Sequence, residues 1–207
     1  MKRTHVIVVR HGETTWNTEK RWQGHLDSPL TPKGLTQAHA LAKRLTNHRF
    51  SALYSSDLGR AYQTAEIIAA ATGHQVALDA RLRERNLGIF QGLTSDEIKA
   101  VHAQEYELYH ARDPDHVLPG GESLRQQVER NFRCFEELAP RHIEESIVVV
   151  THGGVLSGLL RRVLAIPLEA PRRFAFPNSS LNVFIFREAE WMLQTWGDTT
   201  HLDSEME

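Results

Sequence analysis

The sequence predicts an α/β fold built around a largely parallel sheet, and three observations carry this prediction. The runs Val6–Val9 and Ile147–Val150 are uninterrupted, apolar and β-branched, which is typical of strands covered on both faces. Short runs of this kind alternate along the chain with longer segments of helical periodicity. The last two strand signals are separated only by a short, mostly polar stretch, which indicates an antiparallel hairpin. The predicted sheet is therefore mixed.

The strand predictions rest on short apolar runs that are rich in Val, Ile, Leu, Phe or Trp. In chain order they cover His5–Val9, Ala52–Ser55, Val76–Leu78, Ile147–Thr151, Leu181–Phe186 and Trp191–Trp196.

The helix predictions rest on capping residues followed by apolar residues at helical spacing. Thr31 has the chemistry of an N-cap, and Pro32 suits the first helical position. Asp57 is the predicted cap of the next helix, which we expect to end at Gly73. The apolar stripes of these two helices are Leu35, Ala38, Ala42 and Leu45, and then Leu58, Ala61, Ala65 and Ile68.

Two further helices are predicted in the second half of the chain. Ser123 and Gln126 have the spacing of a capping box, and a long apolar stripe follows them. Gly153 or Gly154 opens the other helix. The segment from Thr94 to Gly121 lacks strand character, and we expect it to form a small helical excursion over the functional site.

The composition limits the functional classes. The chain has 207 residues, which suits one domain, and a formal net charge of −2, so no overall basic field attracts nucleic acid. The lone cysteine, Cys134, falls in a helical apolar pattern and is expected to be a core residue. No apolar run is long enough for a membrane span, and the opening run is too short for a signal peptide, so we expect a cytoplasmic protein without a membrane partner.

A His-Gly pair follows each of the two most apolar strands. His11 follows the first of these strands, with Arg10 before it, and His152 follows the other, with Gly153 after it. Ligands of open α/β sheets gather at the carboxyl ends of the strands, so parallel neighbours would bring both histidines to one edge. Imidazoles, a guanidinium group and glycine N–H groups there predict an anion site.

Six ordered blocks of the sequence resemble the histidine phosphatase superfamily, which includes cofactor-dependent phosphoglycerate mutases and related phosphatases. The blocks are VRHGETTWN (Val9–Asn17), WQGHLDSPLTPKG (Trp22–Gly34), SSDLGRAYQTAE (Ser55–Glu66), LRERNLGIFQG (Leu82–Gly92), PGGES (Pro119–Ser123) and VTHGG (Val150–Gly154). The resemblance implies a three-layer α/β/α fold with a mixed, mostly parallel central sheet, phosphoglycerate mutase-like. It implies a single domain over residues 1–207, with the lid-like helical insertion at about 94–121.

The resemblance also implies roles for individual residues. His11 would be the nucleophile that carries the phosphoryl group, and Arg10, Arg60 and His152 would hold the phosphoryl oxygens. Glu84 would be the general acid that protonates the leaving oxygen.

The substrate-binding residues implied by the resemblance lie mainly in loops. Asn17, Gln23 and Gly24 lie in segments that the family uses to cradle phosphate, and Gly153 adds a backbone N–H group. We expect specificity to be set by residues 87–119 and 176–182. The expected partner is a small phosphomonoester.

Three functions stay open at this stage, and a phosphatase is favoured. The 12 histidines show no spacing of known metal ligands, so we expect no metal and no other cofactor. The stretch after Glu84 lacks the aromatic and basic pairing associated with mutases, and the segment to Pro119 is not strongly basic. A phosphoglycerate mutase is the first alternative, and a phospholigand-binding module without activity is the second. The physiological ester and the oligomeric state are not predicted.

Overall fold

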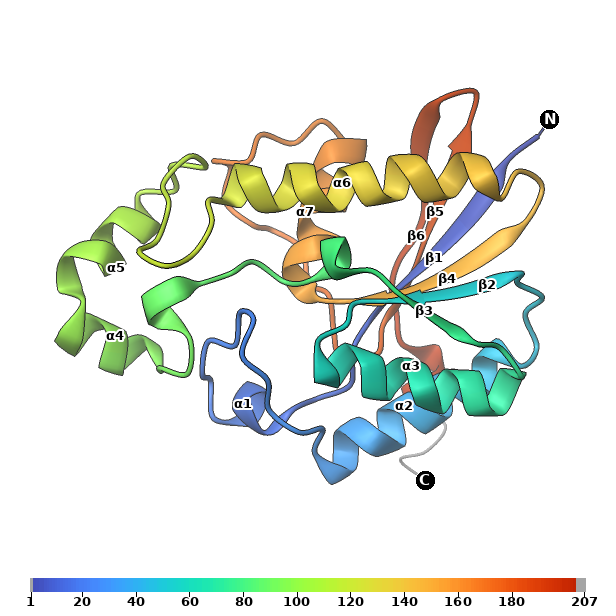
Figure 1. The fold of residues 1–207 in the computed structure, drawn as a ribbon, viewed down its shortest axis with the longest axis horizontal. Coiled ribbons are helices and arrows are strands. Elements are labelled where there is room, and N and C mark those ends of the chain that lie inside the picture. The colour runs from blue at the N-terminus through green and yellow to red at the C-terminus, as the bar shows by residue number, and fades with distance from the viewer. Residues whose placement is uncertain (1, 204–207) are drawn as a thin grey trace.

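One six-stranded sheet runs through the middle of the molecule in this computed structural model, which describes residues 2–203 (Figure 1). The spatial order is β3-β2-β4-β1-β5-β6. Strands β1 to β4 are mutually parallel, and β5 and β6 are antiparallel additions at one edge. The strands are β1 (Thr4–Arg10), β2 (Ala52–Ser55), β3 (Val76–Leu78), β4 (Ser146–Thr151), β5 (Leu181–Arg187) and β6 (Glu190–Asp198).

Helices cover both faces of this sheet, which gives the predicted three-layer α/β/α arrangement. Helices α6 and α7 lie on one face, α2 and α3 lie on the other, and α4 and α5 project beyond the end of the sheet (Figure 1). The helices are α1 (Thr15–Thr18), α2 (Pro32–Leu45), α3 (Gly59–Thr72), α4 (Ser95–Val101), α5 (Ala103–His110), α6 (Leu124–Arg141), α7 (Gly153–Val163) and α8 (Thr200–Asp203). Two short 3₁₀ helices cover Ala80–Leu82 and Gly88–Phe90.

The two central strands bury every second residue on each face, as their continuous apolar runs predict. Val6 and Val8 pack in the core that α6 and α7 cover. Ile7 and Val9 pack in the core under α2 and α3. Since β1 and β4 pair in parallel with Arg10 opposite Thr151, the next residue of each strand emerges at the same edge.

Most of the predicted helix boundaries are confirmed. The Thr31 side chain caps α2 by accepting from the backbone N–H of Gly34, with Pro32 in the first turn. The capping box of α6 has both bonds, between Ser123 and Gln126. Gly73 ends α3 in the left-handed conformation, with φ of 75°. The two hairpin strands are longer than predicted: β5 ends one residue later, and β6 begins one residue earlier and ends two residues later.

The prediction that Asp57 caps α3 is wrong. The N-cap position is Leu58, and the carboxylate of Asp57 instead binds the guanidinium of Arg83 through two hydrogen bonds of 2.7 and 2.5 Å. Asp27, from a distant loop, takes over the cap and accepts from the backbone N–H of Gly59 at 2.6 Å. Asp57 has the residue type and the sequence position of an N-cap, but in the folded chain Asp27 makes the capping hydrogen bond.

Helices α4 and α5 belong to a small apolar cluster separate from the two main cores. Phe90, Ile98 and Leu118 are fully buried in it, and Trp22 and Tyr109 pack against it. The segment between residues 94 and 121 is therefore anchored by its own side chains at the end of the sheet where the central histidines emerge. Within residues 2–203, we find no helix with the length and apolar character that crossing a bilayer requires.

Candidate active site

The two histidines that follow β1 and β4 meet at the carboxyl edge of the sheet. The ring centroids of His11 and His152 lie 5.3 Å apart, with 59° between the ring planes. His11 is 3% exposed and His152 is 0% exposed. The predicted juxtaposition of these two residues is confirmed.

His11 is held in the form that a nucleophile needs. Its Nδ1 lies 2.8 Å from the carbonyl oxygen of Gly12. Because that carbonyl only accepts, Nδ1 carries the hydrogen and Nε2 keeps its lone pair. Burial, and then the charges of Arg60 and Arg10, hold the pKa of His11 well below its ordinary value. His11 is therefore neutral near pH 7.

Arg10 reaches the site from the last position of β1. Its Nη1 donates to the carbonyl oxygen of Phe176 at 2.9 Å, and its guanidinium lies 5.6 Å from the centroid of the Phe176 ring. Burial lowers the pKa of Arg10 to about 10, against the opposing charge of Glu84. At neutral pH the guanidinium stays charged.

Arg60 enters the same space from the first turn of α3. It is 2% exposed, and Nη1 donates to the carbonyl of Leu26 at 2.9 Å and to Asp27 Oδ1 at 2.7 Å. Nη2 donates to the carbonyl of Gly24 at 2.8 Å. Burial lowers the pKa of this guanidinium as well. The side chain of Arg60 is thus buried among the residues that line the cavity, next to the anion site for which the resemblance implies it.

Three buried nitrogen atoms beside His11 have no hydrogen-bond partner within residues 2–203. They are Arg10 Nε, Arg60 Nε and His152 Nδ1. The fourth such atom among the described side chains is Ser179 Oγ. Buried polar atoms are nearly always paired, so a cluster of unpaired ones indicates a place for a ligand. Because two of the three nitrogens belong to the guanidinium groups of Arg10 and Arg60, the ligand that fits this place is an anion.

Ser56 orients His152 and was not found by sequence reasoning. Its Oγ lies 2.8 Å from His152 Nε2, and it also accepts from the backbone N–H of Leu58 at 3.3 Å. A hydroxyl that donates to Nε2 leaves the hydrogen on Nδ1, the unpaired atom. Burial, and then the charge of Arg60, lower the pKa of His152. A neutral His152 in this tautomer presents an N–H donor to the site.

The carboxyl group of Glu84 faces the start of α7. Its Oε2 accepts from the backbone N–H of Gly154 at 2.8 Å, and its Oε1 accepts from the backbone N–H of Arg85 at 2.8 Å. Arg83 is occupied by Asp57, so Glu84 is not the partner of that guanidinium. The carboxyl group lines the same cavity as His11 and Arg10.

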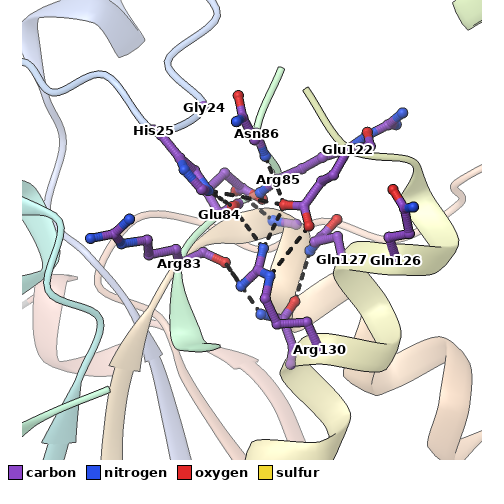
Figure 2. A network of polar contacts seen from close by, with 12 residues as sticks. Gly24, His25, Arg83, Glu84, Arg85, Asn86, Glu122, Gln126, Gln127 and Arg130 are labelled. Carbon is purple, nitrogen blue, oxygen red and sulfur yellow. Dashed lines mark hydrogen bonds and ion pairs between the residues drawn. The ribbon is translucent and has the colours of Figure 1, made fainter. Parts of the chain in front are cut away.

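The chain segment that carries Glu84 is clamped from α6. Arg130 donates to the backbone carbonyls of Arg81, Arg83 and Glu84 at 2.8, 3.1 and 3.2 Å (Figure 2). The same guanidinium forms an ion pair with Glu122 at 2.6 Å. Every bond of Arg130 to this segment goes to the backbone, so it fixes the path of the chain rather than a neighbouring side chain.

Other contacts complete this clamp from the loop side. Glu122 accepts from the backbone N–H of Asn86 at 2.9 Å, and His25 Nε2 lies 2.9 Å from the carbonyl oxygen of Glu84 (Figure 2). Glu122 lies in the sequence block PGGES, whose glutamate had no assigned role. At position 122 a glutamate can therefore hold both the backbone of Asn86 and the guanidinium of Arg130.

The four predicted binding residues line one cavity together with the catalytic candidates. This cavity has a volume of about 440 Å³ and includes Asn17, Gln23, Gly24 and Gly153 in its wall. Gly24 has a φ of 56°, where a side chain would be strained. A Cβ at Gly153 would lie 2.7 Å from the ring of Phe176. His152 is fully buried and is not among the residues that line the cavity.

Sequence reasoning missed part of the cavity wall. Tyr109, Arg112 and Phe176 fall in the segments predicted to set specificity, but Arg161 and Arg172 do not. The sequence did contain a signal for Arg161. Residues 154, 157 and 161 of α7 recur at helical spacing, and all three line the cavity. Among residues 2–203, no three His, Cys, Asp or Glu side chains gather as metal ligands would.

Comparison with known proteins decides the family. The sequence model of the histidine phosphatase superfamily (branch 1) matches residues 6–199. The chain belongs to the histidine phosphatase superfamily. Its fold and its family were thus both predicted correctly, and the protein is an enzyme of this superfamily.

Individual relatives of this histidine phosphatase carry phosphatase and mutase names. It is 42% identical over 202 residues to phosphoglycerate mutase-like protein 4 of Arabidopsis thaliana, which covers 96% of this chain and 86% of the relative. It is 38% identical over 204 residues to the metal-independent phosphoserine phosphatase of the same plant, covering 97% and 84%. The solved structure of Bacillus stearothermophilus YhfR has a TM-score of 0.89 and 33% identity, covering 96% and 99%.

Proposed function

We propose that the protein is a metal-independent phosphomonoesterase that hydrolyses small phosphate esters through a covalent phosphohistidine on His11. The unpaired nitrogens of Arg10, Arg60 and His152 beside the His11 ring carry this proposal. A phosphoryl group has three non-bridging oxygens over which charge spreads in the transition state, and three donors match them.

In the first step, His11 Nε2 attacks phosphorus while the bond from phosphorus to the ester oxygen breaks. Arg10, Arg60 and His152 hold the three non-bridging oxygens. Glu84, in its protonated form, gives a proton to the departing alkoxide, which leaves as the alcohol. The products of this step are the free alcohol, a phosphorus–nitrogen bond on His11 and the Glu84 carboxylate.

In the second step, water attacks the phosphorus of the phosphohistidine. The Glu84 carboxylate takes one proton from that water, so the nucleophile approaches as hydroxide. The phosphorus–nitrogen bond breaks, its electron pair returns to His11 Nε2, and inorganic phosphate leaves. Each group has then regained its starting protonation state, and no metal ion enters the scheme.

The fate of the phosphohistidine separates the phosphatase from the mutase alternative. Transfer to water gives inorganic phosphate, whereas transfer to a bound phosphoglycerate gives its isomer. One relative is named as a phosphoglycerate mutase-like protein and another as a phosphoserine phosphatase. The second name supports transfer of the phosphoryl group to water. Phosphate release from 3-phosphoglycerate, measured with and without 2,3-bisphosphoglycerate beside the formation of 2-phosphoglycerate, tests the choice.

The direct test of the proposed function is turnover of 4-nitrophenyl phosphate after dialysis against EDTA. We expect the dialysed wild type to retain full activity, and His11→Ala to lose at least about 10³-fold in kcat because the nucleophile is gone. His39→Ala is the matched control, because His39 is exposed and does not line the cavity. Activity that requires an added metal, or that survives in His11→Ala, would refute the proposal.

A further inference from the structure

The imidazole of His11 is bound to the backbone of the next residue. Its Nδ1 lies 2.8 Å from the carbonyl oxygen of Gly12. This oxygen belongs to the peptide group that joins Gly12 to Glu13. A rotation of that peptide group would therefore turn the imidazole as well, and with it the lone pair on Nε2.

Glycine stands at position 12 because a side chain does not fit there. A Cβ at Gly12 would lie 2.5 Å from the carbonyl oxygen of Gly34 in α2. Glycine has more freedom in φ and ψ than other residues, so the peptide groups on its two sides turn more easily. The orientation of the Gly12 carbonyl therefore depends on contacts with other parts of the chain.

Gln37 holds the peptide group that carries this carbonyl. The side chain lies in α2, and its Oε1 accepts from the backbone N–H of Glu13 at 2.9 Å. The N–H and the carbonyl of one planar peptide group point in opposite directions, so a partner at each end fixes the plane. For this peptide group the two partners are Gln37 and the His11 imidazole.

Thr64 holds the preceding peptide group, which joins His11 to Gly12. Its Oγ1 accepts from the backbone N–H of Gly12 at 3.1 Å and donates to the carbonyl of Arg60 at 2.9 Å. Thr64 is fully buried in α3. Because the hydroxyl has one hydrogen and the Arg60 carbonyl accepts it, the hydroxyl oxygen is left as an acceptor for Gly12.

Asn178 and Ser179 hold the other end of the same peptide group. Asn178 Nδ2 donates to the carbonyl of His11 at 3.0 Å, and the backbone N–H of Ser179 donates to the same carbonyl at 3.3 Å. Ser179 has a φ of 55°, a left-handed conformation that persists where surrounding contacts hold it. The loop before β5 thus fixes the backbone of His11 from the side opposite to α3.

The side chains of Gln37, Thr64 and Asn178 lie behind the site rather than in its wall. None of the three lines the cavity, so none is placed to touch a substrate. They come from α2, α3 and the loop before β5, which are far apart in the sequence. Their hydrogen bonds nevertheless end on the two successive peptide groups that flank Gly12.

We infer that these three side chains are positioning residues, which hold the His11 imidazole with Nε2 directed at the phosphoryl site. Gln37 acts most directly, because it bonds to the peptide group whose carbonyl binds Nδ1. Without its acceptor this peptide group turns, and Nε2 is misdirected while the three donors for the phosphoryl oxygens stay in place. The inference rests on the proposed function, since it names residues that prepare its nucleophile.

Gln37→Met tests the role of the first peptide group, because methionine is close to glutamine in size and lacks a strong acceptor. We expect kcat/KM to fall about tenfold for an alkyl phosphate and for 4-nitrophenyl phosphate alike, since both need the same attack by Nε2. The inhibition constant of inorganic phosphate should stay within about threefold, because the donors remain. Gln63→Met is the control: Gln63 is exposed and does not line the cavity, so kcat/KM should be unchanged.

Thr64→Val and Thr64→Ser form a matched pair at the second peptide group. Valine keeps the shape of threonine but leaves the Gly12 N–H without its acceptor, so kcat/KM should fall about tenfold. Serine keeps the hydroxyl and should stay within about threefold of the wild type. Thr72→Val, which removes a hydroxyl that donates to the carbonyl of Ile68 at the far end of α3, should leave kcat/KM unchanged. Equal losses in Thr64→Val and Thr64→Ser would contradict the role of the acceptor.

A measurement without turnover keeps this inference separate from the proposed function. In protein labelled with ¹⁵N-histidine, the Nδ1 proton of His11 should exchange with solvent at least about tenfold faster in Gln37→Met than in the wild type, because the Gly12 carbonyl is no longer fixed. Faster exchange in a protein that hydrolyses no ester would support the positioning role and refute the phosphatase. Unchanged exchange would overturn the inference whatever the activity, since the imidazole is then held as before, and would leave the phosphatase intact.

Discussion

A single methyl group at residue 154 should disable the proposed acid while leaving the fold in place. A Cβ built at Gly154 lies 2.0 Å from Glu84 Oε1, which is far below van der Waals contact. The obstructing atom is the end of a flexible side chain, so the carboxyl group moves and the helix does not. The substitution also disturbs the bond from the backbone N–H of Gly154 to Oε2.

The magnitude follows from the displacement. Restoring an ordinary contact moves the carboxyl group by more than about 1 Å, and a misplacement of that size costs about 10²-fold in rate. A positioned general acid contributes about 10²–10⁴-fold in total, so this loss fits within the contribution of Glu84. Gly154→Ala should therefore reduce kcat/KM for an alkyl phosphate about 10²-fold. The loss for 4-nitrophenyl phosphate should be under about tenfold, because 4-nitrophenolate leaves without a proton.

The assay compares the two esters under identical conditions and measures stability by urea denaturation. The free energy of unfolding should stay within about 1 kcal/mol of the wild type, since alanine favours the helix and one hydrogen bond is disturbed. Gly158→Ala is the control in the same helix: its Cβ would lie 2.8 Å from a methyl of Val128 and does not approach Glu84. An equal loss for both esters, or no loss for either, would refute the assignment of Glu84 as the acid.

Three further predictions concern the elements around the site. Asp27→Ala should lower the free energy of unfolding by about 1–2 kcal/mol, because it removes both the cap of α3 and the ion pair with the buried Arg60. Asp57→Ala should cost less, about 0–1 kcal/mol, and urea denaturation that gives the reverse order would contradict these contacts. Burial holds the pKa of His11 and His152 well below 6.5, so only the unfolded chain takes up these protons as pH falls below about 6.5. The free energy of unfolding should then fall by about 1.4 kcal/mol per pH unit for each histidine, and a flat profile from pH 7 to 5 would exclude this. Arg130→Gln should slow alkyl phosphates about tenfold more than 4-nitrophenyl phosphate, whereas a uniform loss would leave the clamp with a structural role only.

The centre of the fold was predictable because local signals and tertiary structure agree there. Uninterrupted β-branched runs occur where strands are covered on both faces, and both β1 and β4 have such runs. Their parallel pairing fixes His11 and His152 at one edge without any further information. The neighbourhood of His11 followed from the chain pattern together with the sequence blocks of the family.

The contacts that depend on distant segments were not predictable in this way. Asp27 caps a helix that begins some thirty residues later, and a suitable local acid, Asp57, stood in the expected position. Arg161 and Arg172 reach the cavity from α7 and the loop that follows it. Helical spacing alone relates Arg161 to the cavity-lining residues of α7, and no sequence pattern of this kind includes Arg172. The burial of Arg161 depends on the packing of distant segments.

Labelling of the protein with a ³²P-phosphate ester, quenched during turnover, tests the central claim most directly. The label should be stable to alkali and lost in acid, as a phosphorus–nitrogen bond requires, and it should map to the peptide that contains His11. His11→Ala should remain unlabelled, while Glu84→Gln should still accept label from 4-nitrophenyl phosphate. Acid-stable label, or label on any residue other than His11, would contradict the account.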